Sequence, residues 1–170
     1  LPESLLSIGK YAFDGSKLLK TVILPKNLEL IDSYAFRGCI ALENLKMPAG
    51  LKTINGHAFE NCTGLKNVSL NGGLTSLGET HVFAGCTALE KIEIPETVTK
   101  INSHTFHGCT GLTEVILSEN LETIYSYAFE NCTSLERIDL PDSVRELTSR
   151  AFYNCTDLSE VGYPSGWTTV

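Results

Sequence analysis

The sequence predicts an α/β solenoid, a single curved right-handed array of stacked coils. Each repeat should place one short parallel strand on the concave face and short extended, 3₁₀ or helical turns on the convex side. Three observations predict this fold: a motif that recurs about every 23 residues, a short stretch in each motif where apolar and variable residues alternate, and 42% hydrophobic residues among 170, enough for one continuous core.

The repeat is marked most clearly by phenylalanine, which recurs in steps of 23 residues with a single step of 24. The phenylalanines are Phe13, Phe36, Phe59, Phe83, Phe106, Phe129 and Phe152. A leucine follows each of them after six residues, and a cysteine follows after three, except in the first repeat, which has Ser16. No single repeat can bury its apolar side chains alone, so we expect stability to come from stacking between neighbours.

One short strand per repeat is predicted nine to eleven residues after each phenylalanine. Apolar residues there alternate with variable ones, as in Leu45-Lys46-Met47, which is the pattern of a half-buried strand. Proline follows in most repeats and suits the end of a strand, because it has no N–H to donate. The next apolar pair, such as Leu51 with Ile54 or Leu121 with Ile124, predicts a second short extended segment on the opposite wall.

The segment around each phenylalanine is expected to form one helical or 3₁₀ turn, because it is too short for a full helix. The position two residues after the phenylalanine holds only glycine or asparagine, so we predict a left-handed backbone there. These residues are Gly15, Gly38, Asn61, Gly85, Gly108, Asn131 and Asn154. The extra residue of the 24-residue repeat lies between Leu77 and Phe83 and predicts a local bulge.

The full pattern L-x-x-I-x-x-x-A-F-x-[GN]-C-x-x-L-x-x-[VI]-x-[LI]-P resembles the BspA-like leucine-rich repeat, found mainly in bacterial surface proteins. The resemblance covers residues 1–164, expected to be one repeat array that begins in mid-repeat and belongs to a longer array. It implies adhesion or protein binding, and an extracellular or cell-surface location. Residues 165–170 leave the pattern and are expected to form a C-terminal tail or partial cap.

Six cysteines in a small exported domain would ordinarily suggest disulfides. All six, however, occupy the same position of the repeat, so stacking should hold their side chains parallel, whereas a disulfide needs Cβ atoms that face each other. We expect a ladder of buried free thiols, with Ser16 as a near-isostere, in preference to a disulfide or metal role.

His57, His81 and His104 share the position two before the phenylalanine in successive repeats, which raises the alternatives of a metal site or a pH sensor. The same position holds tyrosine in other repeats, so a ring that covers the edge of the core is the simpler requirement. We expect the extra residue to displace His81. His107 follows His104 on the turn, but no column of carboxylates is expected beside them, so no metal site is predicted.

No catalytic or phosphate-binding motif is present, so we expect a protein that is not an enzyme and uses no cofactor. The net charge of −7 comes from interspersed acids and bases, which argues against nucleic acid as a partner. The sequence has no run of about eighteen apolar residues and no signal-peptide pattern, so membrane insertion is not expected.

Function is expected on the strand face, at the variable residues that flank the buried middle of each strand. A solvated polar face is the alternative, but outward isoleucines and mixed charges, such as Lys91 with Glu93 and Arg137 with Asp139, favour a partner. The predicted partner-binding residues are Ile23, Asn44, Lys46, Asn67, Ser69, Lys91, Glu93, Glu114, Ile116, Arg137 and Asp139.

We therefore predict a monomeric binding module of a bacterial surface or secreted protein, with a protein or glycan ligand and a host extracellular protein as one candidate. Two alternatives stay open from sequence: a structural spacer that presents another domain, and a repeat region appended to an enzyme.

Overall fold

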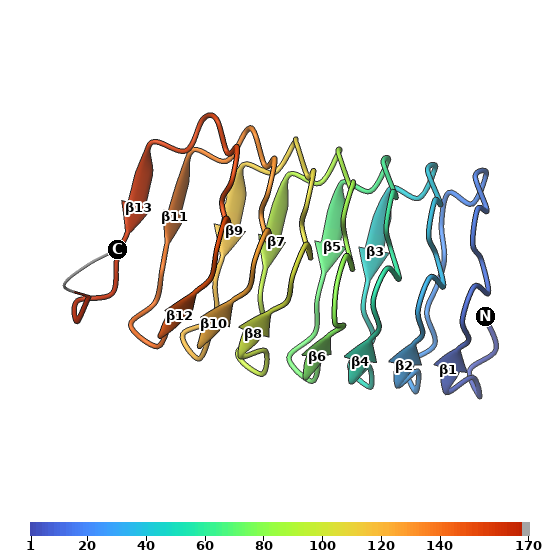
Figure 1. Ribbon diagram of the computed structural model, residues 1–170. Coiled ribbons are helices and arrows are strands. Elements are labelled where there is room, and N and C mark those ends of the chain that lie inside the picture. The colour runs from blue at the N-terminus through green and yellow to red at the C-terminus, as the bar shows by residue number, and fades with distance from the viewer. Residues whose placement is uncertain (168–170) are drawn as a thin grey trace.

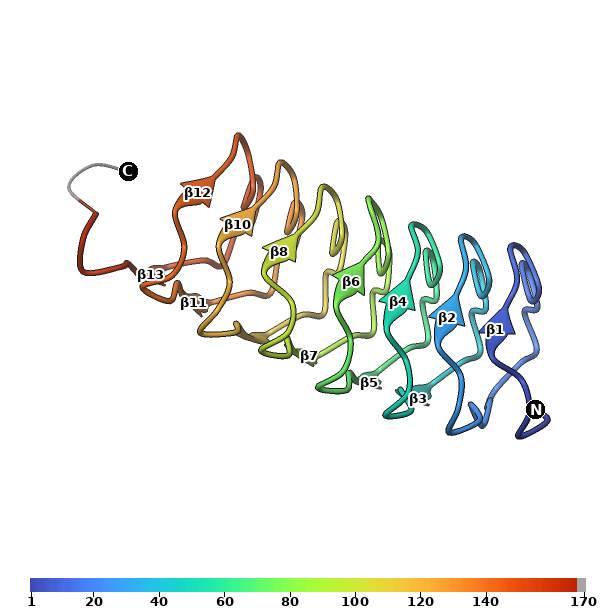
Figure 2. The same ribbon diagram turned by 90° about the horizontal axis from the view of Figure 1, so that it is seen from below.

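The computed structural model describes residues 1–167, which form a solenoid of about seven coils with two columns of short parallel strands. Seen from below, the columns appear as separate rows along the molecule (Figure 1, Figure 2). The first column contains β3 (Asn44–Lys46), β5 (Asn67–Ser69), β7 (Lys91–Glu93), β9 (Glu114–Ile116), β11 (Arg137–Asp139) and β13 (Glu160–Gly162). The second column contains β1 (Ser7–Ile8), β2 (Leu30–Ile31), β4 (Thr53–Ile54), β6 (Ser76–Leu77), β8 (Lys100–Ile101), β10 (Thr123–Ile124) and β12 (Glu146–Leu147).

The strand pairing places equivalent residues of successive repeats side by side. In the first column the sheets have the orders β3-β5-β7-β9 and β11-β13, and in the second β1-β2-β4-β6 and β8-β10-β12. Leu45 of β3, for example, pairs with Val68 of β5, one repeat later. Both the strand predicted in each repeat and the second extended segment are therefore confirmed, although the first repeat has no assigned strand around Val22.

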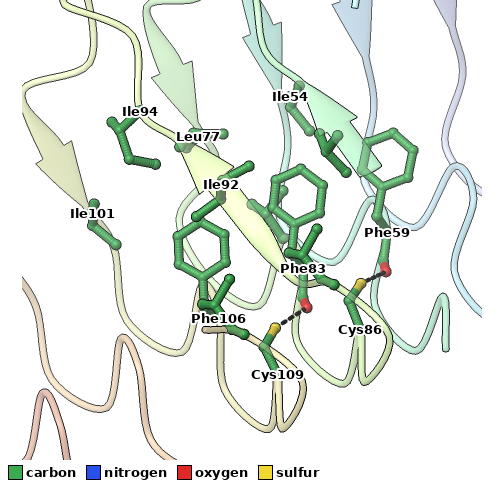
Figure 3. Close-up of a cluster of buried hydrophobic side chains, with 14 of the residues drawn as sticks. Ile54, Phe59, Leu77, Phe83, Cys86, Ile92, Ile94, Ile101, Phe106 and Cys109 are labelled. Carbon is green, nitrogen blue, oxygen red and sulfur yellow. Dashed lines mark hydrogen bonds between the residues drawn. The ribbon is translucent and has the colours of Figure 1, made fainter. Parts of the chain in front are cut away.

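The core is a stack of phenylalanine rings through the centre of the coils. Phe36, Phe59, Phe83, Phe106 and Phe129 are fully buried, and adjacent rings of the seven lie 5.0–5.8 Å apart between centroids. Leucines and isoleucines of the strands fill the space around them (Figure 3). Because each ring contacts the rings of both neighbouring coils, core packing joins the repeats into one body.

The expected α/β class and the helical turns are wrong, because residues 1–167 contain no helix. In the segment around Phe36, alternate N–H groups point in different directions. Those of Ala35 and Arg37 close turns within the repeat, whereas those of Phe36 and Gly38 donate to Ala58 and Glu60 of the next repeat at 2.8 Å. A helix would direct every N–H along its own axis, so bonding between coils excludes it here.

The predicted left-handed column of glycine and asparagine is confirmed, with φ between +58° and +71° at all seven positions. A second left-handed column was not predicted. It occupies the position two before each phenylalanine, where φ is +53° to +61°. Its members are Tyr11, Tyr34, His57, His81, His104, Tyr127 and Arg150. These residue types gave no signal for it, since bulky residues seldom adopt this conformation.

The extra residue of the 24-residue repeat is absorbed at Gly78 and Glu79. Gly78 has φ +49°, and a Cβ added there would lie 2.7 Å from the backbone nitrogen of Gly56, so only glycine fits. The repeat register is restored at Thr80, which forms an isolated bridge with Ser103. The second-column sheet is interrupted between β6 and β8, as expected for a local bulge.

The cysteines form the predicted ladder of free thiols. Each Sγ donates a hydrogen bond of 3.1–3.3 Å to the carbonyl oxygen of the phenylalanine in the preceding repeat. Five are buried, and Cys155 is partly exposed. Figure 3 shows two of these bonds, Cys86 to Phe59 and Cys109 to Phe83.

At the C-terminal end, Trp167 packs against the core, and its indole N–H donates to the carbonyl oxygen of Val144 at 3.1 Å. Trp167 lies 23 residues after Val144 and so continues an apolar column of the repeat. Of the expected tail 165–170, residues 168–170 lie outside the described residues. No helix within residues 1–167 has the length and apolar character needed to cross a membrane.

Candidate functional site

The strand face presents the variable residues of the first column to solvent. In β3, β5, β7, β9 and β11 the middle residue is buried and both flanking residues are exposed. This follows from the alternation of side chains along a strand, since the middle residue packs on the phenylalanine core. Ten of the eleven predicted partner-binding residues lie on these strands, and Ile23, 82% exposed, precedes them along the same column.

Six of those residues line one hollow with a volume of about 780 Å³. They come from three adjacent strands: Asn44 and Lys46 of β3, Asn67 and Ser69 of β5, and Lys91 and Glu93 of β7. The other five predicted residues are Ile23, Glu114, Ile116, Arg137 and Asp139, which lie outside this lining. The structure thus divides the predicted face into a hollow over β3, β5 and β7 and a region over β9 and β11 that lies outside it.

Residues of the loop after each strand also line the hollow, and sequence reasoning missed them. They include Gly72, Pro95 and Glu96. In the repeat of Gly72, Asn71 replaces the usual proline, and its side chain accepts a hydrogen bond from the Gly73 N–H at 2.6 Å. The substitution of proline by Asn71 was the available signal, because asparagine before two glycines predicts a different turn at the rim.

The charges over the strand face pair both between neighbouring strands and within one strand. Lys91 contacts Glu114 of the next strand at 2.6 Å, not Glu93 of its own strand. Arg137 binds Asp139 through two hydrogen bonds of 2.7 and 2.9 Å and also contacts Glu160. The guanidinium group lowers the pKa of Asp139 by hydrogen bonding. Exposed pairs of this kind contribute little to stability.

Within the hollow, Lys46 makes no ion pair with any residue of the described range 1–167. Beside it the amide side chains of Asn44 and Asn67 are joined by a hydrogen bond of 2.7 Å. The hollow therefore offers one free ammonium group, amide donors and acceptors, and a floor of buried aliphatic residues. The hollow thus presents both polar and apolar groups to a ligand.

A second feature of the surface is an edge of stacked rings on the turns. Tyr11, Tyr34, His57, His81, His104 and Tyr127 form an uninterrupted stack with centroid separations of 4.5–4.9 Å. The expectation that the extra residue displaces His81 is wrong, because the register is restored at Thr80, one residue earlier. The ring covering expected for this column is thus present from Tyr11 to Tyr127, and Arg150 occupies the last position.

Carboxylates also flank this stack, contrary to expectation. The carboxylate of Glu60 contacts His57 Nδ1 at 3.0 Å, and that of Glu130 contacts His107 Nδ1 at 2.8 Å. Both glutamates directly follow the phenylalanine of their repeats, a position that also holds Asp14, Arg37 and Ala84. The sequence did not predict these glutamate–histidine contacts, because they depend on how far the two side chains extend across the turn.

Burial changes the protonation of the central rings of this stack. The pKa of His81 is lowered by desolvation first and then by the neighbouring imidazoles of His104 and His57. Desolvation is likewise the main cause that lowers the pKa of His104, followed by His107. A lowered pKa favours the neutral imidazole, whose unprotonated ring nitrogen can accept a hydrogen bond or bind a metal ion.

Comparison with known proteins gives a consistent result for the family and fold. A family model described as the BspA type leucine rich repeat region, with 6 copies, matches residues 1–86 and 79–170. A search of curated proteins gave no match.

Three solved structures show the same fold. A leucine-rich repeat protein of T. pallidum has 31% identity and a TM-score of 0.77, over 83% of this chain and 68% of its own. One from Eubacterium ventriosum has 26% identity and a TM-score of 0.84, over 98% of this chain and 44% of its own. A leucine rich cell surface protein from Faecalibacterium prausnitzii has 34% identity and a TM-score of 0.59, over 85% of this chain and 32% of its own.

The chain spans less than half of the second and third of these proteins. The family model nevertheless extends over the whole sequence, and the cysteine ladder and stacked phenylalanines account for the residues that define its repeat. The chain therefore belongs to the BspA-type leucine-rich repeat family.

Proposed function

We propose that this chain is a non-catalytic binding module of a bacterial cell-surface or secreted protein, and that it binds a protein or glycan ligand through its strand face. The observation that carries the proposal is the hollow over β3, β5 and β7. Its lining combines residues at variable positions of otherwise regular repeats, so its chemistry can change without cost to the core.

The nature of the lining favours a polar or charged ligand. Lys46 lacks an ion-pair partner within residues 1–167. Lys91, Glu93 and Glu96 also line the hollow, so it carries charges of both signs. Charges of both signs at the rim of an interface discriminate between partners more than they add affinity. The cell-surface location is supported by the similar protein from Faecalibacterium prausnitzii, which is a leucine rich cell surface protein.

The test is a binding screen of the chain against immobilised extracellular-matrix proteins and a glycan array, followed by three single charge reversals. Lys46→Glu and Lys91→Glu alter the hollow, and Arg137→Glu alters the region over β9 and β11. Lys100→Glu lies on β8 in the other strand column and is the matched control. Circular dichroism verifies that each variant is folded.

We expect Lys46→Glu and Lys91→Glu to weaken binding by roughly tenfold or more, as for loss of a favourable charge in an interface. Lys100→Glu should bind like the unaltered chain. If only Arg137→Glu lowers the binding affinity, the binding site lies over β9 and β11 and not in the hollow. Absence of binding in both screens, or binding unchanged by all three strand-face reversals, would contradict the proposal and favour a structural spacer.

A further inference from the structure

Three potential metal ligands converge on the edge of stacked rings. His104 and His107 lie on the turn after β8, and Glu130 lies at the equivalent turn after β10. Glu130 Oε2 is 2.8 Å from His107 Nδ1 and 3.8 Å from His104 Nδ1, and the three ligand atoms lie within 4.8 Å of one another. Glu130 follows His107 by one repeat of 23 residues, so the stacking register of the solenoid brings them together.

The two histidine nitrogens are shielded from solvent but not satisfied. Neither His104 Nδ1 nor His107 Nδ1 has a hydrogen-bond partner among residues 1–167, although the glutamate oxygen is near both. The short contact to His107 therefore brings the carboxylate close without the geometry of a hydrogen bond. Shielded polar atoms without partners are costly and uncommon, and a bound metal ion would supply the missing partner for both nitrogens.

The distances suit a small cation between the three atoms. Zn²⁺ binds nitrogen and oxygen at about 2.0–2.2 Å, which places neighbouring tetrahedral ligands about 3.3 Å apart. The separations of 2.8 and 3.8 Å lie on either side of that value. Two imidazoles and one carboxylate are also a donor set that Zn²⁺ prefers over Mg²⁺ or Ca²⁺.

We propose that His104, His107 and Glu130 form a binding site for a divalent transition-metal ion, with Zn²⁺ the best match, and that water completes the coordination. The site is partly open, since the side chains of His104 and His107 are 30% and 37% exposed and that of Glu130 is 17% exposed. An ion can therefore enter from solvent and keep a water ligand.

The surrounding structure holds the ligands in place before any ion binds. The ring of His104 is stacked between those of His81 and Tyr127, at 4.5 and 4.9 Å. The ring of His107 meets His104 edge-on at 5.6 Å, and the Nδ1 atoms of both rings lie within 3.8 Å of Glu130 Oε2. Preorganised ligands lose little conformational entropy on binding, which favours affinity.

The same solenoid contains a natural comparison site. His57 and Glu60 form a similar pair at 3.0 Å, but there the imidazole is hydrogen-bonded to the carboxylate, and residues 1–167 provide no third ligand for a metal group. The position after the phenylalanine in the next repeat is Ala84, where the other site has Glu130. A metal should therefore bind at His104, His107 and Glu130 in preference to His57 and Glu60.

The experiment is isothermal titration of untagged chain with ZnCl₂, together with the absorption spectrum of the chain with Co²⁺. The repeat itself supplies variants that preserve the fold. His107→Ala copies Ala84, His104→Tyr copies Tyr127, and Glu130→Gln retains shape without charge. His57→Tyr and Cys155→Ser are the controls, because Cys155 is the partly exposed cysteine of the six.

We expect one Zn²⁺ per chain, with affinity lowered by roughly tenfold or more in His107→Ala, His104→Tyr and Glu130→Gln, since even outer-shell changes cost about that much. Both controls should bind like the unaltered chain, and the Co²⁺ spectrum should lack a thiolate charge-transfer band. Absence of Zn²⁺ binding, binding retained in His107→Ala, or a thiolate band abolished by Cys155→Ser would overturn the proposal.

Discussion

The thiol of Cys109 donates a hydrogen bond of 3.2 Å to the carbonyl oxygen of Phe83 in the preceding repeat. This bond connects adjacent coils at the turn where the backbone is left-handed on both sides of the phenylalanine. A small side chain with a weak donor is required there, because the thiol is packed beneath the turn. The other five cysteines make the equivalent bond, so a thiol hydrogen bond links each pair of successive repeats.

The buried thiols should be chemically inert in the folded protein. Burial raises the pKa of Cys39 to about 11 and the pKa values of Cys62 and Cys109 to about 12, so almost no reactive thiolate exists at neutral pH. Titration with a thiol reagent should label Cys155 first and the buried cysteines only after unfolding. Denaturation without reductant should then release six free thiols, and recovery of far fewer would mean that disulfides exist.

The phenylalanine stack should contribute most at its centre. Phe83→Ala removes a fully buried ring with stacked neighbours on both sides and should lower the free energy of unfolding by about 3–5 kcal/mol. Phe13→Ala removes a half-buried ring with one stacked neighbour and should cost clearly less. Urea denaturation followed by circular dichroism compares the two, and equal losses would show that the stack is not cooperative along its length.

The left-handed turn should discriminate between residues that tolerate positive φ and those that do not. Gly108 has φ +69°, and a Cβ there would have no contact closer than 3.9 Å, so space is available and only the backbone conformation limits substitution. Gly108→Asn copies Asn131 and should be nearly neutral, whereas Gly108→Val should destabilise by about 1–3 kcal/mol. Thermal unfolding measures both, and a neutral valine variant would argue against a strained turn at this position.

Asp32 should give the solenoid part of its dependence on acid. Its carboxylate accepts hydrogen bonds of 2.7 Å from the Asn55 side chain and from the Ser33 N–H, which lower its pKa below the ordinary value of 3.8. Because the folded-state pKa is the lower one, the carboxylate stabilises the fold above pH 3.8, and this contribution is lost as the pH falls through the folded-state pKa.

Asp32→Asn should therefore be less stable than the unaltered chain at neutral pH, and the difference should shrink as the solution is acidified below pH 3.8. Asn55→Ala removes the main donor and should weaken the same acid dependence. Urea denaturation across this pH range measures both variants. A stability difference that is constant with pH would show that the carboxylate charge is not involved.

The sequence by itself determined the repeat, the predicted strand of every coil after the first, the cysteine ladder and the left-handed position of Gly108 and its equivalents, because each of these follows from a residue type at a fixed spacing. Gly108 and Asn131 share one position, and few other residues tolerate positive φ, so that backbone state could be predicted. The exposed residues of β3, β5 and β7 were also predictable, since side chains alternate along a strand.

Only the tertiary structure decided which carbonyl oxygens accept the backbone hydrogen bonds of the segments between those positions. The turns are not helical because the N–H of Phe36 donates to the carbonyl oxygen of Ala58 in the next coil. No pattern within one repeat predicts a hydrogen bond to another coil. The left-handed conformation of Tyr34 and His104 is imposed by the same bonding. The meeting of His104 and His107 with Glu130 likewise depends on side-chain reach between coils, which spacing alone does not determine.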